Sequence, residues 1–171
     1  ARTKLLASAL AAILAPASAL AVAVAPSSVL AADVQKADCR MHAVHLSKVG
    51  DGTIPKELRF LETQLRADEF AIYKGFALVD QKSLKIQRGK TSEVTFSSGN
   101  RLGLSLLDND DKRLKLHASL GSRDGTKSLL NTDYSIEDGG ILMIGAGSYS
   151  HQGNDGKLFF VADVDSAPYG D

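Results

Sequence analysis

The sequence predicts a mainly β protein: an antiparallel sandwich or a barrel-like sheet of about seven to nine strands, with one packed α-helix. Three observations lead to this prediction. Apolar and polar residues alternate with a period of two over several segments that follow Tyr73. Clusters of Gly, Asn and Asp separate these segments at intervals of roughly ten to fifteen residues, close to the spacing of strands in such folds. One segment near residue 60 has a helical period instead.

The clearest alternation lies in two leucine-rich segments, residues 101–106 and 113–120. One polar face and one apolar face are typical of half-buried antiparallel strands. We expect the two segments to form a hairpin with a loop at 108–112, because a slip of one residue would set leucines against charged side chains. The expected pairs are Leu106 with Leu114, Leu104 with Leu116, and Leu102 with Ala118.

A second apolar segment, Ile141 to Ile144, does not alternate. A short continuous apolar run bounded by glycines predicts a central strand that is buried on both faces. Gly145-Ala146-Gly147 follows it, and we expect a strand end or a bulge there rather than a phosphate-binding loop, since no helical pattern comes after it.

The single predicted α-helix covers residues 55–66. Pro55 suits its first turn, and Thr53 precedes it as a cap. One apolar stripe is formed by Leu58, Leu61 and Leu65. We expect this stripe to pack on a sheet.

The N-terminal residues have the pattern of a secretory signal. Arg2 and Lys4 precede an uncharged apolar run from Leu5 to Val24, and small residues follow. We therefore expect a signal peptide at 1–31, a linker at 32–40 and one β-rich domain at 41–171. The run is also long enough to span a bilayer, so an uncleaved membrane anchor remains the alternative.

Charge and cysteine content narrow the function classes. Lys and Arg total 20, as do Asp and Glu, and loss of residues 1–31 leaves a net charge of about −2. This balance argues against nucleic-acid binding, which requires excess positive charge. Cys39 is the only cysteine, so it has no intramolecular partner, and we expect a tolerated thiol near the N-terminus of the domain, with a disulfide to another chain as the alternative.

No metal or cofactor motif stands out. His42 and His45 are three residues apart, so on a strand their side chains lie on opposite faces, and a zinc site needs three or four convergent ligands. The acidic run Asp108 to Asp111 lacks the glycine and glutamate of a calcium loop and predicts a turn. We expect no metal and no cofactor.

Two groups of residues are candidates for binding. The first lies in a predicted loop from Gly145 to Gly156, where Tyr149 is expected to be exposed beside His151. Ser148, Ser150 and Asp155 in the same loop supply the residue types of a hydrolase triad, although no nucleophile elbow surrounds the serines. The second group lies on the polar face of the predicted hairpin: Arg101, Arg113, Lys115 and His117. These side chains could bind a partner or an acidic glycan. The alternative is an ordinary solvated sheet face.

Residues 45–65, followed by Tyr73 to Leu78 and the glycine-punctuated segments up to Val164, resemble a group of short exported proteins of Gram-negative bacteria. These proteins share a signal peptide, one helix that starts with Pro-x-x-Leu, and a leucine-rich β region. The resemblance implies the architecture and carries over no functional residue.

The function we expect is that of a non-enzymatic, exported envelope or extracellular module that binds another macromolecule, namely an envelope or extracellular protein in a larger assembly. Addition of a partner strand to a sheet edge is the expected mode. A small hydrolase or ligand-binding enzyme that uses residues 145–156, and a carbohydrate-binding module, remain the alternatives. Membrane contact is expected only if the signal segment is retained.

Overall fold

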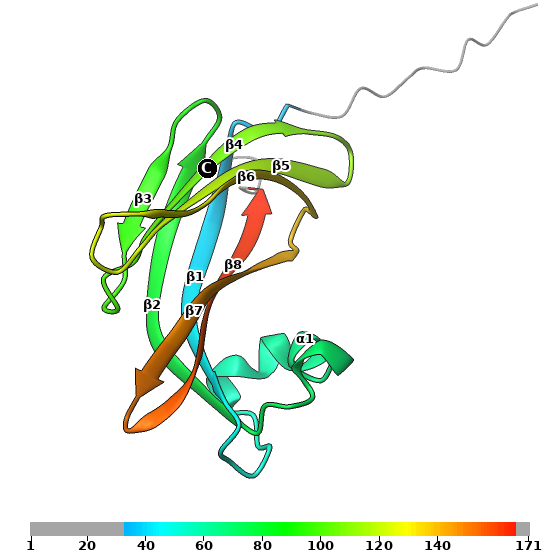
Figure 1. Cartoon of the computed structure of the whole chain (residues 1–171). Helices are drawn as coiled ribbons and strands as arrows, with labels where there is room; N and C mark the ends of the chain where they lie inside the picture. The colour runs from blue at the N-terminus through cyan, green and yellow to red at the C-terminus, as the bar shows by residue number, and fades with distance from the viewer. Residues whose placement is uncertain (1–32, 167–171) are drawn as a thin grey trace, which may run out of the picture.

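The computed structural model describes residues 33–166, so the predicted signal peptide lies outside the described residues. Two four-stranded antiparallel sheets face each other as a sandwich that does not close into a barrel (Figure 1). Sheet A has the strand order β2-β1-β8-β7, and sheet B has the order β3-β4-β5-β6. The strands are β1 (Lys36–Ser47), β2 (Gly75–Gln87), β3 (Ser92–Thr95), β4 (Arg101–Asn109), β5 (Arg113–Gly121), β6 (Ser128–Glu137), β7 (Ile141–His151) and β8 (Asn154–Ser166).

The main core lies between the two sheets, and the predicted alternation produces it. The leucines of β4 and β5 that alternate with polar residues are fully buried. From sheet A, Phe160 packs against Phe96 with ring centroids 4.5 Å apart. The period-two pattern therefore assigned the faces of these strands correctly.

The register of the β4–β5 hairpin differs from the prediction by two residues. Leu106 pairs with Leu116, and Leu104 pairs with Ala118. The difference arises because the ladder is interrupted between Leu106 and Asp108, and because Asp110 Oδ1 accepts the backbone N–H groups of Lys112 and Arg113 in a shorter turn. A shift of two residues keeps every side chain on its face, so burial alone does not distinguish the two registers.

Strand β1 begins at Lys36, so the prediction of a linker over 32–40 is wrong for its last five residues. Ala37 and Cys39 continue the buried alternation of β1 toward the N-terminus, where short side chains made the pattern hard to see. Cys39 is 1% exposed, and burial raises the pKa of its thiol to about 12. It is therefore a core residue of the sandwich and not an accessible thiol.

The predicted helix at 55–66 is a composite of short pieces. A 3-10 helix, η1 (Lys56–Leu61), leads into a single α-helical turn, α1 (Glu62–Leu65), and a second 3-10 turn, η2 (Asp68–Phe70), follows. Neither η1 nor α1 has a side-chain cap, and the three-residue spacing of Leu58 and Leu61 suits the 3-10 geometry. Among the described residues, no helix is long and apolar enough to cross a membrane.

We call η1, α1 and η2 together the helical segment. It covers the outer face of sheet A, the face opposite to sheet B, at one end of the molecule (Figure 1). Its leucines form a second apolar cluster with Val44 and Val161. Ile141 and Met143 of β7 pack against this second cluster, while Leu142 and Ile144 belong to the main core. The prediction of a central strand at 141–144 is wrong, because β7 is an edge strand whose two faces are covered by different layers.

Candidate functional site

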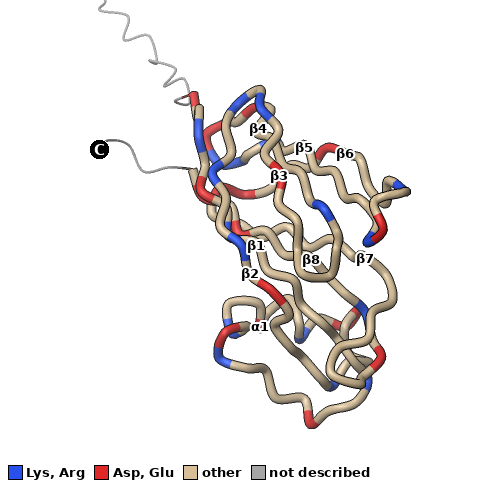
Figure 2. Tube along the Cα trace, turned by 90° about the vertical axis from the view of Figure 1, so that its left-hand side faces the viewer, with Lys and Arg blue, Asp and Glu red and all other residues tan. Residues whose placement is uncertain are grey.

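The four edge strands of the two sheets differ in charge. Strand β2 carries Asp80 and two lysines, β3 carries Glu93, and β6 carries Asp133 and Glu137. Figure 2 shows basic and acidic segments along β2. Strand β7 contains no Asp, Glu, Lys, Arg or Pro. Charges and prolines are the usual protection of exposed edges, so among the described edges β7 is the one without it.

The hydrogen-bonding pattern shows which groups of β7 point to its free edge. The Val164 N–H donates to the Gly140 carbonyl oxygen at 3.2 Å, and the β7–β8 ladder continues from there in register. Hydrogen-bonded and non-hydrogen-bonded pairs alternate in an antiparallel ladder. The N–H and C=O groups of Ile141, Met143 and Gly145 therefore point away from β8. Within residues 33–166 no other strand pairs with this side of β7.

A bulge ends this regular run of outward groups. The register shifts between Gly145 and Gly147, where Ala146 is the extra residue and Gly147 has a φ of +93°. The predicted bulge is confirmed. We call Ile141–Gly145 the open edge, because a partner strand can extend along it without meeting the bulge.

Beyond the bulge, the expected loop from Gly145 to Gly156 is a hairpin. Strand β7 continues to His151, and β8 begins at Asn154. The two residues between them, Gln152 and Gly153, have φ values of +50° and +79°, as a tight two-residue turn requires. The prediction of a long loop is wrong because its glycines serve a bulge and a turn instead.

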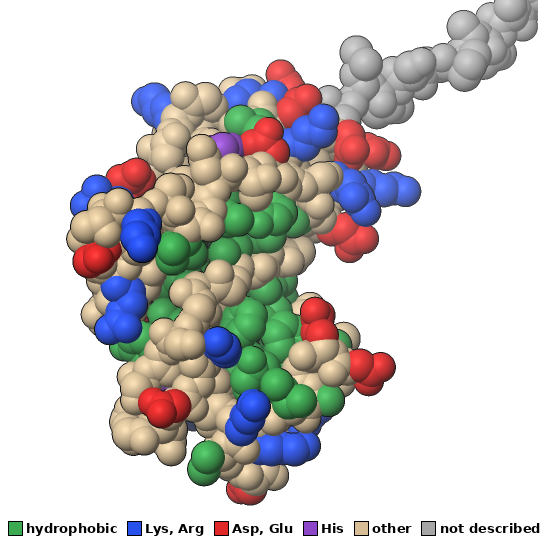
Figure 3. Space-filling view, in the orientation of Figure 1, with side chains coloured by type: hydrophobic (Ala, Val, Ile, Leu, Met, Phe, Trp, Pro, Cys, Tyr) green, Lys and Arg blue, Asp and Glu red, His purple; other side chains and the backbone are tan. Residues whose placement is uncertain are grey.

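Hydrophobic side chains flank the open edge on both sides. Toward the helical segment, Ile141 and Met143 are half-buried, and Phe159 meets Phe70 edge-on with ring centroids 5.5 Å apart. Toward the main core, Leu142 is almost fully buried. Figure 3 shows hydrophobic side chains gathered in a hollow of the molecule, between the strands above and the helical segment below. An added strand would cover apolar surface here as well as form backbone hydrogen bonds.

The far end of β7 is fixed by aromatic and histidine side chains. His45 is 3% exposed, and its Nε2–H donates to the Tyr149 carbonyl oxygen at 3.0 Å. Burial lowers the pKa of His45, which favours the neutral ring. The Arg123 guanidinium lies 5.0 Å from the centroid of the Tyr149 ring, so a loop of sheet B covers it. Tyr149 is half-buried, and the expectation that it is exposed is wrong.

The five binding residues predicted from the sequence fall into two separate groups. Tyr149 and His151 lie on β7 in sheet A, whereas the others lie on β5 in sheet B: Arg113, Lys115 and His117. His117 contacts Asp133 through Nδ1 and Asn131 through Nε2, both at 2.6 Å, and the bond to Asp133 raises the pKa of His117. His117 therefore pairs across strands with an acidic residue, and Arg113 faces Glu137 in the β5–β6 ladder, an arrangement common on solvated sheet faces.

The residues suggested for a hydrolase triad have other partners. Ser148 Oγ accepts a hydrogen bond from Lys157 Nζ at 3.0 Å, and Ser150 faces Asp155 in the ladder. The His151 ring lies 5.7 Å from the His45 ring. In residues 33–166 no hydrogen bond joins either serine to His151.

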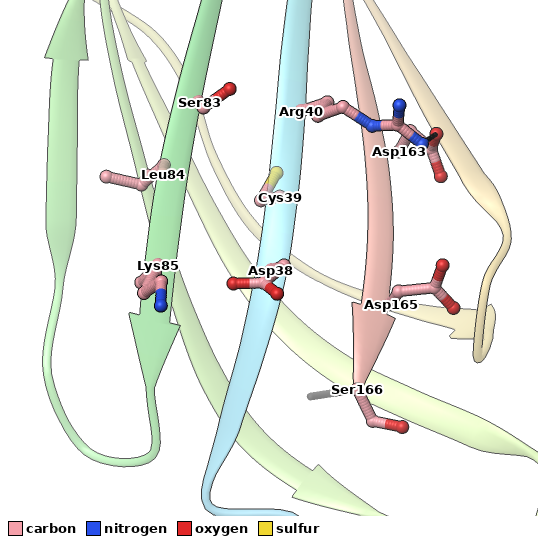
Figure 4. A pocket seen from close by; sticks show the side chains of 9 residues that line it. All are labelled: Asp38, Cys39, Arg40, Ser83, Leu84, Lys85, Asp163, Asp165 and Ser166. Atoms are coloured by element: carbon pink, nitrogen blue, oxygen red, sulfur yellow. Dashed lines mark hydrogen bonds and ion pairs between the residues drawn. The ribbon is translucent and has the colours of Figure 1, made fainter. Parts of the chain in front are cut away.

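The outer face of sheet A holds a wide depression of about 750 Å³ beyond the helical segment (Figure 4). Arg40 and Asp163 form an ion pair across it at 3.3 Å. Asp38 lies between Lys85 and Asp165 of the neighbouring strands. In the described part of the chain no group of three His, Cys, Asp or Glu side chains is arranged to hold a metal ion.

His42 and His45 lie on opposite faces of sheet A, as their spacing predicted. The His42 ring packs on Phe60, with centroids 4.6 Å apart, at a small cavity of about 280 Å³. Its Nδ1 is buried without a hydrogen-bond partner, and burial lowers the pKa of the ring. No local sequence pattern indicated this contact, because Phe60 lies on a different element.

No family model matches the chain, and no curated protein sequence matches it. Among solved structures, the chain is similar to the cryo-EM structure of the T2SS secretin XcpQ from Pseudomonas aeruginosa, with 11% sequence identity and a TM-score of 0.32. The likeness covers 75% of this chain and 54% of that chain, so this chain spans about half of its length. A TM-score this low does not indicate a shared fold.

Proposed function

We propose that this protein is a non-enzymatic module of the cell envelope or extracellular space that binds a protein by accepting an extended strand at the open edge, Ile141–Gly145. The observation that carries the proposal is the run of outward backbone groups at Ile141, Met143 and Gly145, on an edge strand without charge or proline. Strand addition uses such groups for affinity, and neighbouring side-chain pockets for selectivity.

The surroundings of the open edge favour an uncharged partner strand. The net contribution of one backbone hydrogen bond to the binding free energy is about 0.5–1.5 kcal/mol. A short partner strand therefore needs apolar contacts as well. Half-buried Met143 and Phe159 supply those contacts on the helical side. A charged side chain placed against these apolar groups would lose part of its hydration. Selectivity therefore comes from the apolar flanks.

The envelope or extracellular location in this proposal is inferred from the N-terminal residues. Arg2 and Lys4 followed by the apolar run to Val24 have the order of a secretory signal. They lie outside the described residues, and the support is the sequence pattern alone.

The proposal is tested by site-specific photo-crosslinking in the native host. A benzophenone amino acid is placed at Met143 of the full exported chain, and at exposed Lys115 as the control on the outer face of sheet B. We expect a discrete adduct with one protein species from position 143 and none from position 115. Equal adducts from both positions, or none from position 143, would contradict the proposal.

A matched pair of variants at Gly145 tests whether the adduct depends on strand pairing. Gly145→Pro removes an N–H that points to the free edge and deletes no side chain, and proline is tolerated at such edge positions. Gly145→Ala keeps the N–H, and its Cβ would lie 3.5 Å from the Phe159 ring, an ordinary contact. We expect the adduct to disappear in the proline variant and to persist in the alanine variant, with both variants unfolding like the wild type.

A further inference from the structure

We propose that the strand accepted by the open edge is the same segment of a second copy of this chain. Two copies would pair β7 with β7 in antiparallel orientation, and the two four-stranded sheets A would join into one continuous sheet across a two-fold axis. This inference rests on the proposed function, and it names the partner. A two-fold axis is the usual symmetry of a homodimer, in which the same patch is used on both subunits.

The backbone groups of the open edge match themselves about Met143. With the axis at Met143, this residue faces Met143 of the partner subunit, and Ile141 faces Gly145 of the partner subunit. All three outward residues of each copy then meet outward residues of the other, which gives about six hydrogen bonds, two for each pair. Moving the axis by one residue in either direction leaves one outward residue of the open edge without a match in the other open edge.

The side chains of the open edge also complement one another in this register. Ile141 lies opposite a glycine, whose missing side chain leaves room for it. On the core side, Leu142 lies opposite Ile144 of the partner subunit. Every side chain brought together is uncharged. Large residues opposite small ones and apolar residues opposite apolar ones are the conditions for a packed strand pair.

The other edge strands of the chain do not offer this match. Pairing β7 with β2, β3 or β6 of a second copy would bring Asp80, Glu93 or Asp133, or their charged neighbours, toward the apolar hollow shown in Figure 3. A charge buried there without a partner is strongly unfavourable. Among the described strands, β7 is therefore the one that β7 itself accepts.

The first test is the mass of the exported protein in solution, by sedimentation over a wide concentration range. We expect the wild type and Lys115→Ala, a change at an exposed position on the outer face of sheet B, to dimerise. Gly145→Pro, which removes one donor from each copy, should raise the dissociation constant about tenfold or more. Ile141→Lys should act in the same direction through charge. Monomers at every concentration of wild type, or an unchanged dimer in a folded Gly145→Pro variant, would overturn the inference.

A cysteine placed on the axis provides a second, geometric test. In a hydrogen-bonded antiparallel pair the Cα atoms are about 5.5 Å apart, which a disulfide can span. Met143→Cys should therefore form a covalent dimer on mild oxidation, while Lys115→Cys should not. Cys39 does not compete, because it is buried. Failure of Met143→Cys to cross-link in a folded dimer would contradict the register.

The photo-crosslinking experiment separates this inference from the proposed function. An adduct at position 143 with twice the mass of the chain supports both. An adduct with a different protein, together with a monomeric wild type, overturns the second-copy inference and leaves strand addition in place. A monomeric wild type with no adduct at position 143 overturns both.

Discussion

Gly156 of β8 lies beneath the ring of His45, where an added methyl group has no room. An ideal Cβ at this position would overlap the Leu46 carbonyl oxygen and would lie 2.6 Å from His45 Nε2. The Leu46 carbonyl belongs to β1, which pairs with β8 along its length, so it cannot move without disturbing that ladder. Gly156→Ala therefore tests the packing that holds the end of β7 in place.

Overpacking of this kind costs about 1–3 kcal/mol. With an unfolding entropy of about 2.1 cal/mol/K per residue, a domain of about 130 residues should lose roughly 4–11 °C in melting temperature. Thermal and urea unfolding followed by circular dichroism measure the loss. Gly145→Ala is the control, because its Cβ makes an ordinary contact and both variants lose the same backbone freedom of glycine. If Gly156→Ala has the same melting temperature as the wild type and Gly145→Ala, the described position of His45 over β8 is wrong.

Three further predictions concern the core and the titratable groups. The fold lowers the pKa of His42 and His45, so the unfolded chain binds protons that the folded chain does not; it raises the pKa of His117, which acts in the opposite direction, so the test uses His117→Asn. The stability of this variant should fall from about pH 7.5 to about pH 5.5, and an unchanged urea midpoint over this range would contradict this. Cys39, with a pKa of about 12, should react slowly with iodoacetamide in the native protein and quickly in denaturant, whereas equal rates would show that it is accessible. Leu104→Ala should cost about 2–5 kcal/mol in urea unfolding, and Leu107→Ala, at a position 41% exposed, less than about 0.5 kcal/mol; similar losses would refute the assigned faces of β4.

The candidate site was only partly predictable from the sequence. Tyr149 and His151 were singled out, and the bulge after Gly145 was expected, because aromatic residues and glycine pairs are local signals. The contact of Tyr149 with His45 joins residues that lie 104 positions apart, and no local pattern encodes it. The open edge was not singled out, since its residues look like those of any buried strand.

The sequence by itself determined the central residues of most strands, which face of the alternating strands is apolar, and that His42 and His45 lie on opposite sides. These properties follow from the alternation of side chains along a strand, which is local. The tertiary structure decided the pairing of the strands, the start of β1 at Lys36, and the place of β7 at an edge. The run from Ile141 to Ile144 is apolar on both faces because sheet B and the helical segment cover it from two sides. Burial on two faces says nothing about whether a strand has a neighbour on each side, so only the strand order shows that the backbone of β7 is free to pair.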